Sequence, residues 1–263
     1  MKKKLTYLMV LAGLCLACST VQAETTTTTS TTSSSSETQE AHWGYEDEIS
    51  PEYWGSLSEE YAACSDGTEQ SPINITGAED VDLPSLSLKS KSSKVTVLNN
   101  GHTIQVTPEN SDNTLTVGDK TYTLKQFHFH APSENEIDGK QYPLEGHFVY
   151  KTDDGQIAVV SVLYQYGKEN KGLKEVWKNM PTKVNEEKEV SKSISISNLF
   201  PEDQDYYNFE GSLTTPPCTE GVNWIVFKKQ ETISKAQVKK FSETIGVANN
   251  RPLQDLNGRE IEE

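Results

Sequence analysis

The sequence lacks an apolar run long enough to cross a membrane. The longest, "LTYLMVLAGLCLAC", has 14 residues, whereas a membrane-spanning helix needs about 20. It follows Lys2, Lys3 and Lys4 and precedes "VQA", which is the pattern of a secretory signal. We therefore expect residues 1–23 to be a signal peptide that is cleaved after Ala23, and the mature chain to have no transmembrane segment.

The same signal predicts an exported protein of the periplasm, the cell surface or the surrounding medium. Lipidation at Cys18, which would anchor the chain to a membrane, is an alternative. Cys15 stands at the third position before Cys18 and fits a lipidation site poorly. Cleavage after Ala23 is therefore favoured.

Basic residues are also scarce, with 24 Lys and Arg against 39 Asp and Glu, so that the formal net charge is −15. Removing the signal takes away three lysines and no acidic residue, which changes this charge from −15 to −18. Such a surface repels phosphate backbones and anionic membranes. We expect no nucleic-acid partner and interpret the charge as a source of solubility.

Cysteine is nearly absent from the mature chain, which keeps only Cys64 and Cys218. Disulfides persist in the oxidising compartments that exported proteins reach. The two thiols either pair with each other or stay separate and buried, and an oxidising compartment favours the pair.

The chain changes character after a tract of Thr and Ser at residues 25–36. Such a tract cannot bury apolar surface, so we expect a flexible linker over 24–41 and a folded domain over 42–263. That domain is rich in short segments of β-branched and aromatic residues with a period of two, whereas helical patterns are few. Strands are expected at 94–100, 102–107, 114–130, 145–152, 156–167 and 223–230, and helices at 172–181 and 234–245.

Only five histidines are present, and "KQFHFH" places two of them two positions apart. In a strand, His128 and His130 point to the same face. A polar face that happens to carry two imidazoles is the alternative for this pair alone. His147 lies 17 residues beyond His130 in another strand-like segment. If the residues between them form a hairpin connection, His147 returns beside the pair.

Three imidazoles leave one tetrahedral position open, which is the arrangement of a catalytic zinc ion. The helix-borne H-E-x-x-H motif of metalloproteases is absent. Gln126 and Glu145 each precede a proposed ligand by two residues, so they share its strand face. Ligand histidines need an acceptor on the second ring nitrogen, and these two residues would supply it. Ordinary surface polarity is the alternative for each of them.

Several motifs together resemble α-class carbonic anhydrases of bacterial type. They span nearly the whole expected domain in order: "HWGYE", "QSPINI", "NNGHTIQV", "FHFH", "SEN", "EGHFVY", "SLTTPPC", "NWIVF" and "NNRP". The resemblance implies a mainly β, α+β fold. Its centre is a large, mostly antiparallel twisted sheet of about ten strands, with short helices at the periphery.

The resemblance also implies a reaction, the reversible hydration of CO₂ to bicarbonate and a proton. His128, His130 and His147 would bind Zn²⁺, and hydroxide on the metal would attack CO₂. Thr214 would accept a hydrogen bond from that hydroxide and so orient it, while its own hydroxyl donates a hydrogen bond to Glu134. Weak ester cleavage is expected as a side activity.

Further residues take on roles only through the resemblance. For each apolar one taken alone, core packing is the commoner role. The apolar wall for CO₂ would be formed by Val149, Val159, Leu213, Val222 and Trp224, and the polar side of the cavity by Thr215 and Gln105. His102 would pass protons to solvent, although after the turn "NNG" it also fits a plain solvated residue.

The N-terminal part of the domain matches the entry to the site, at His42, Trp43 and Tyr45. Cys64 and Cys218 match a disulfide that would brace the loop of Thr214. A non-catalytic surface-binding module on the same scaffold is the alternative function. Such relatives typically lack a zinc histidine, whereas all three are present here. The partners would be CO₂ and bicarbonate, and the chain would be a monomer or homodimer.

Overall fold

The computed structural model describes residues 41–263, and these belong to one compact unit. The expected signal peptide, Cys15, Cys18 and nearly all of the expected linker lie outside the described residues. Among the helices of the described part, none is both long and apolar enough to span a membrane.

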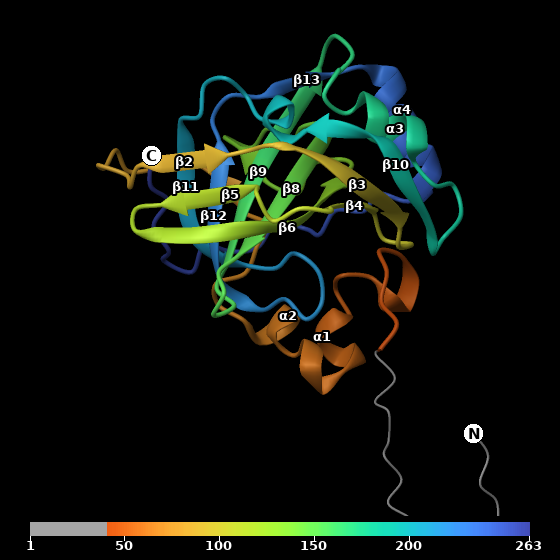
Figure 1. Ribbon diagram of the computed structural model, residues 1–263. Helices are drawn as coiled ribbons and strands as arrows, with labels where there is room; N and C mark the ends of the chain where they lie inside the picture. Colours follow the sequence, from red (N-terminus) through yellow and green to blue (C-terminus); the bar gives the residue numbers. More distant parts are fainter. Residues whose placement is uncertain (1–40) are drawn as a thin grey trace, which may run out of the picture. The chain divides into compact units, whose positions relative to one another are not determined.

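One 11-stranded sheet dominates this unit (Figure 1). Its strands are β2 (Leu86–Lys89), β3 (Ser92–Asn99), β4 (Ile104–Pro108), β5 (Thr114–Val117), β6 (Lys120–His130), β8 (Leu144–Lys151), β9 (Ile157–Tyr166), β10 (Glu186–Ser195), β11 (Tyr206–Ser212), β12 (Glu220–Phe227) and β13 (Glu231–Ile233). The main path is β10-β3-β4-β6-β8-β9-β12-β11. Most neighbours are antiparallel, and β9 pairs in parallel with β12 and β13. The predicted large, mostly antiparallel sheet is confirmed.

The helices are short and lie around the sheet, as predicted (Figure 1). They are α1 (Trp54–Leu57), α2 (Ala63–Asp66), α3 (Lys174–Asn179), α4 (Lys235–Ile245) and the 3₁₀ turns η1 (Asp47–Ile49), η2 (Glu59–Tyr61) and η3 (Ile196–Leu199). A separate parallel pair joins β1 (Asn74–Ile75) to β7 (Glu136–Ile137). The longest helix, α4, begins with a capping box of Ser234 and Gln237 and ends at Gly246, whose φ is +89°.

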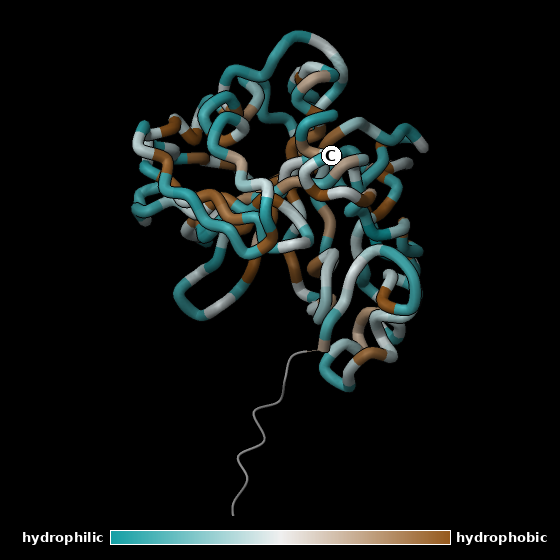
Figure 2. The backbone as a smooth tube through the Cα atoms, turned by 90° about the vertical axis from the view of Figure 1, so that its right-hand side faces the viewer, coloured by the Kyte–Doolittle hydropathy of each residue, from teal (hydrophilic) through white to brown (hydrophobic). Residues whose placement is uncertain are grey.

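Side-chain alternation gives the sheet two different faces. On β6, Phe127 and Phe129 enter the larger core, where Phe129 meets Trp177 of α3 and Phe241 of α4. Figure 2 shows hydrophobic stretches of the backbone in the interior and mostly hydrophilic loops around them. The opposite face of the same strands carries His128 and His130. One strand thus fixes the core and the histidines together.

The outer strands β10 and β11 were not predicted. β10 reads "EEKEVSKSIS"; half of its residues are exposed and only two are buried. Charged side chains are typical of strands at a sheet edge, where they discourage pairing with other chains. Because few of its residues are apolar, β10 shows no apolar alternation, and the sequence pattern did not predict it.

A disulfide joins Cys64 of α2 to Cys218, as predicted. Cys218 lies in the loop between β11 and β12, which also carries Thr214. The buried Arg251 guanidinium donates to the carbonyl oxygens of Cys64 and Ser71, each at 2.8 Å. A covalent bond and a buried cation therefore hold this loop and the N-terminal helices to the sheet.

We expect Tyr150→Phe to leave the free energy of unfolding within about 0.5 kcal/mol of the wild type. The Tyr150 hydroxyl is buried and has no hydrogen-bond partner among the described residues, so its removal leaves no partner unpaired. Tyr206 is the matched control, because its hydroxyl donates to the Pro84 carbonyl at 2.7 Å. Tyr206→Phe should lower the free energy of unfolding by about 1 kcal/mol. Equal losses in urea titrations of both variants would contradict this difference.

Candidate metal centre

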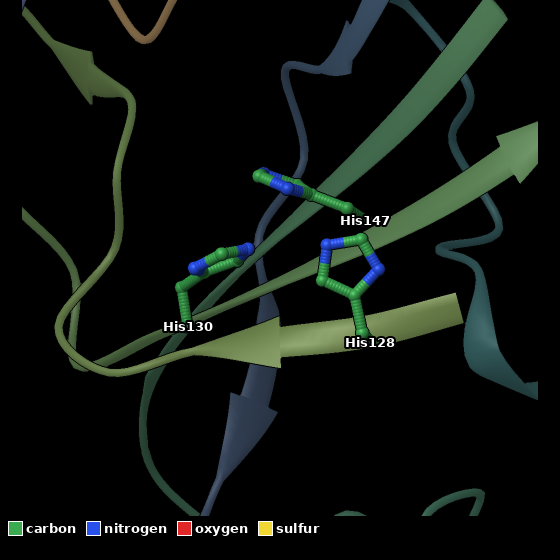
Figure 3. Close-up of side chains that lie close together, drawn as sticks. All are labelled: His128, His130 and His147. Carbon is green, nitrogen blue, oxygen red and sulfur yellow. The ribbon is translucent and has the colours of Figure 1, made fainter. Parts of the chain in front are cut away.

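Three histidines meet at the middle of the sheet (Figure 3). The antiparallel register of β6 and β8 sets His128 directly opposite His147. His130 follows on the same face of β6. One ligand atom from each ring lies within 4.8 Å of those of the other two. The sequence suggested that the chain turns back after His130, and this antiparallel pairing of β6 and β8 brings the three imidazoles together.

Each imidazole is held on one of its two nitrogens. His128 Nδ1 lies 2.9 Å from Gln126 Oε1, and His147 Nε2 lies 2.9 Å from Glu145 Oε1. His130 Nδ1 lies 2.7 Å from the carbonyl oxygen of Asn249. Gln126 Oε1 and the Asn249 carbonyl oxygen accept hydrogen bonds from the nitrogens that face them, whereas the His147–Glu145 contact is as short but lies outside hydrogen-bond geometry. An oxygen that can only accept favours the proton on the ring nitrogen that faces it, and the Glu145 carboxylate does the same for His147 Nε2.

The opposite nitrogens are then lone-pair donors: Nε2 of His128 and His130, and Nδ1 of His147. His130 Nε2 is buried and has no hydrogen-bond partner among the described residues. A buried, unpaired nitrogen is costly unless something binds it. Burial also lowers the pKa of His128, with further lowering by His130 and His147, and lowers the pKa of His130. Neutral imidazoles with converging lone pairs fit a divalent metal ion such as zinc.

Glu145 is an ionised anchor beneath this cluster. Burial raises the pKa of its carboxyl group, but His147, Ser161 and Asn135 outweigh burial and bring the pKa to about 2. Ser161 Oγ donates to Oε1 at 2.6 Å, and Asn135 Nδ2 donates to it at 2.7 Å. The backbone N–H of Glu134 donates to Oε2 at 2.7 Å. These donors fix the carboxylate that holds His147.

Glu134 is also buried and lies beside two of the histidines, with Oε1 3.4 Å from His130 Nδ1 and Oε2 3.8 Å from His147 Nδ1. Its Oε1 accepts from the backbone N–H of Arg251 at 2.8 Å. Burial raises the pKa of this carboxyl group to about 7, against the lowering effects of His147, the Arg251 N–H and the Thr214 side chain. A cation bound by the histidines would lower this pKa further.

A cavity of about 450 Å³ opens beside the histidines. Its lining combines an apolar wall with polar and basic side chains: Lys125, Gln126, His128, His147, Val149, Lys151, Ile157, Val159, Leu213, Thr214, Thr215 and Trp224. Four of the five residues expected in the apolar wall line it. Val222 does not: it is fully buried and packs in the same apolar cluster, with Val149, Val159 and Trp224.

A second, smaller cavity of about 110 Å³ meets the same site. It shares Gln126, His128 and Thr215 with the first and is otherwise lined by Trp43, Tyr45, Asn100, His102, Thr103, Gln105 and His130. The His102 ring stacks on Trp43, with 3.7 Å between centroids and 8° between planes. Burial lowers the pKa of His102, and the exposed His42 lowers it further. His42 lines neither cavity.

Sequence reasoning assigned no role to Asn249 or Arg251, although "NNRP" contains both. Asn249 holds His130 through a backbone carbonyl, and its side chain donates to the carbonyls of His102 and Phe129. The one signal that could have pointed to Asn249 and Arg251 was their place in "NNRP", a motif that contributes to the family resemblance. Lys125 and Lys151 at the cavity were also missed: strict alternation puts Lys125 on the opposite face of its strand, and Lys151, although it shares the face of His147, was given no role.

We expect Gln126→Ala and Glu145→Gln each to lower the affinity for Zn²⁺ by about 10- to 100-fold, because each loosens the ring it holds. Competition with a chromogenic chelator measures this affinity. Gln156→Ala, at an exposed glutamine outside the cavity, is the matched control. Wild-type affinity in both cavity variants, with the fold intact by circular dichroism, would contradict the anchoring role.

Comparison with known proteins agrees with this geometry. The family model described as "Eukaryotic-type carbonic anhydrase" matches residues 49–263. A carbonic anhydrase of Neisseria gonorrhoeae is 50% identical over 220 residues, which cover 84% of this chain and 87% of the relative. One of Pectobacterium carotovorum is 48% identical over 224 residues, which cover 85% and 91%.

Among solved structures, the α-carbonic anhydrase from Thermovibrio ammonificans in complex with the inhibitor sulfanilamide aligns with a TM-score of 0.83 and 46% identity. The alignment covers 85% of this chain and 99% of that one. Fold, histidine cluster and sequence similarity lead to one assignment: this chain belongs to the eukaryotic-type, or α-class, carbonic anhydrase family.

Proposed function

We propose that this chain is a zinc-dependent carbonic anhydrase that converts CO₂ and water to bicarbonate and a proton, and the reverse. The observation that carries the proposal is the convergence of three imidazoles, each with an oxygen facing one of its nitrogens, beside a largely apolar cavity. Zn²⁺ would be held by Nε2 of His128, Nε2 of His130 and Nδ1 of His147. In carbonic anhydrases generally, such an ion lowers the pKa of its coordinated water to about 7, a value that belongs to the family as a whole.

Thr214 and Glu134 would orient the reacting water. A hydroxyl group has one proton to donate and two lone pairs to accept with. If Thr214 donates toward the Glu134 carboxylate, its lone pairs can accept only from a group on the cavity side. A water or hydroxide beside the histidines would then turn its own lone pair toward the substrate. The support is the effect of the Thr214 side chain on the Glu134 pKa and the position of Thr214 in the cavity lining.

The apolar wall would receive CO₂, which is small and uncharged and needs a dry surface more than a charged clamp. Val149, Val159, Leu213 and Trp224 would form this surface. Val222 would support them from behind, since it packs in the same cluster. Bulk water is kept from this side because the wall offers it no hydrogen-bonding group.

His102 would move the proton that each hydration releases. It lies in the polar cavity that also reaches His128 and His130, and histidine exchanges protons near neutral pH. The lowered pKa keeps its ring mostly neutral at pH 7, ready to accept a proton. Thr215, Gln105 and Tyr45 would support a water path between the histidines and this ring.

The same proposal covers the organisation of the chain, with a signal peptide at 1–23, a linker at 24–41 and a catalytic domain at 42–263. The disulfide is typical of proteins in oxidising compartments, so it supports an extracytoplasmic location. Cleavage after Ala23 remains favoured over lipidation at Cys18. A monomer or homodimer remains the predicted assembly. A non-catalytic binding module is not favoured, because the three histidines, Glu134 and Thr214 are all present.

The test is stopped-flow CO₂ hydration, with the zinc content measured on the same sample. We expect about one zinc per chain and a rate far above that of buffer, which chelation abolishes and added Zn²⁺ restores. His130→Ala should lose both zinc and activity, since it removes a ligand with a buried donor nitrogen. Zinc-loaded, oxidised wild type that leaves CO₂ hydration at the buffer rate would disprove the proposal.

We expect His102→Ala to lower kcat for CO₂ hydration by about tenfold or more in dilute buffer, because a positioned proton acceptor is lost. The value of kcat/KM should stay near wild type, since His102 does not line the apolar cavity. Added imidazole should restore kcat. A variant with wild-type kcat in a buffer that cannot carry protons would remove His102 from the mechanism.

A further inference from the structure

A β-bulge turns Lys125 into the cavity. The register of β6 and β8 shifts between Leu124 and Gln126, so Lys125 has no direct partner on β8. Strict alternation would place Leu124 on the same face as Gln126, and Lys125 on the core face. Instead Leu124 is buried in the core, while Lys125 lines the cavity next to Gln126. An extra residue in one strand re-aims side chains in this way, and such bulges recur beside active sites.

Lys151 reaches the same cavity by ordinary alternation. It follows His147 and Val149 on one face of β8. It is paired with Ile157 of β9, while Val149 is paired with Val159. The apolar wall therefore starts at the histidines and ends at two lysines, both of them exposed.

Neither lysine has an ion-pair partner among the described residues. No Asp or Glu side chain of the described residues lines this cavity either. This lack of acidic neighbours contrasts with the chain as a whole, which has 39 acidic residues and a net charge of −15. Unpaired positive charge is therefore gathered at the cavity beside the histidines, through which an anionic product could leave or an anionic substrate could enter.

We propose that Lys125 and Lys151 form a capture site for bicarbonate, and for small monovalent anions of similar size, at the outer end of the active-site cavity. The inference rests on the proposed function. CO₂ is uncharged and would be unaffected, whereas bicarbonate would be drawn past the otherwise repelling negative surface. The lysines would thus affect the binding of bicarbonate, the charged species of the equilibrium, and not that of CO₂.

The equilibrium constant of the overall reaction limits what these lysines can change. It fixes the ratio of kcat/KM for hydration to kcat/KM for dehydration at a given pH. A site that only strengthens the binding of bicarbonate therefore shows in its inhibition constant as a product, and in KM for dehydration. It does not show as faster chemistry in one direction alone.

The experiment compares wild type with K125Q/K151Q in CO₂ hydration at constant pH and ionic strength, with bicarbonate added as product inhibitor. We expect its inhibition constant to rise about fivefold, since two exposed charges each contribute modestly. KM for CO₂ should stay within twofold, roughly the effect of weak electrostatic coupling. K125R/K151R, which keeps both charges, should resemble wild type.

The control K168Q/K171Q removes two exposed lysines that do not line the cavity, and changes the net charge equally. An unchanged inhibition constant in K125Q/K151Q would overturn the inference. So would an equal rise in K168Q/K171Q, since net charge would then explain it.

A second readout needs no turnover. Bicarbonate should raise the Tm of the zinc-loaded wild type more than that of K125Q/K151Q, because a ligand that binds the folded state stabilises it. Inactive wild type would disprove the proposed function alone, and this difference in Tm would then still decide the anion site. Equal Tm shifts in the two proteins would overturn the anion site.

Discussion

The contact between each imidazole and the oxygen that faces its second nitrogen determines what the site can do. A neutral histidine presents one lone pair, and the acceptor on the other nitrogen decides where that lone pair points. Gln126 and Glu145 hold His128 and His147 at 2.9 Å each, and the carbonyl of Asn249 holds His130 at 2.7 Å. With these acceptors in place, three lone pairs converge in a protein that is already folded. Metal binding then requires little rearrangement, and burial keeps the competing proton away from His128 and His130.

The sheet can hold this arrangement because one of its faces packs the core and the other carries the histidines. Phe127, Phe129 and Phe148 secure the large core, and the residues between them are free to carry chemistry. A strand on a helix-covered sheet is also difficult to displace, so ligands mounted on it keep their positions. The loop that carries Thr214 lacks this support from regular pairing. It is held by the Cys64–Cys218 disulfide. Arg251 links the Cys64 segment to Glu134, since its guanidinium donates to the Cys64 carbonyl and its backbone N–H donates to the Glu134 carboxylate.

Much of the site was predictable because it follows the period of two. "FHFH" indicated two candidate ligands on one face, and the same period indicated Gln126 and Glu145 as acceptors beside candidate ligands. The third candidate ligand needed an antiparallel return of the chain, which the sequence suggested and the register of β6 and β8 shows. Interactions without a side-chain signature could not be predicted. The acceptor for His130 is a backbone carbonyl 119 positions away, and any residue has one.

The misses have related causes. Lys125 faces the cavity only because a bulge breaks the period on which the prediction relied. The edge strand β10 is too charged to show apolar alternation. Val222 was assigned to the cavity wall from the resemblance, but an apolar residue beside a wall and one within it have the same composition. Only packing distinguishes the two.

The two cavities that share Gln126, His128 and Thr215 differ in character, one broad and mostly apolar, the other narrow and polar. A gas molecule and a hydrogen ion would therefore travel by separate routes that meet at the residues the two cavities share. If the proposed routes are separate, a substrate resting against Val149 and Val159 would not obstruct a path of waters toward His102. The two exchanges with the surroundings can then overlap in time.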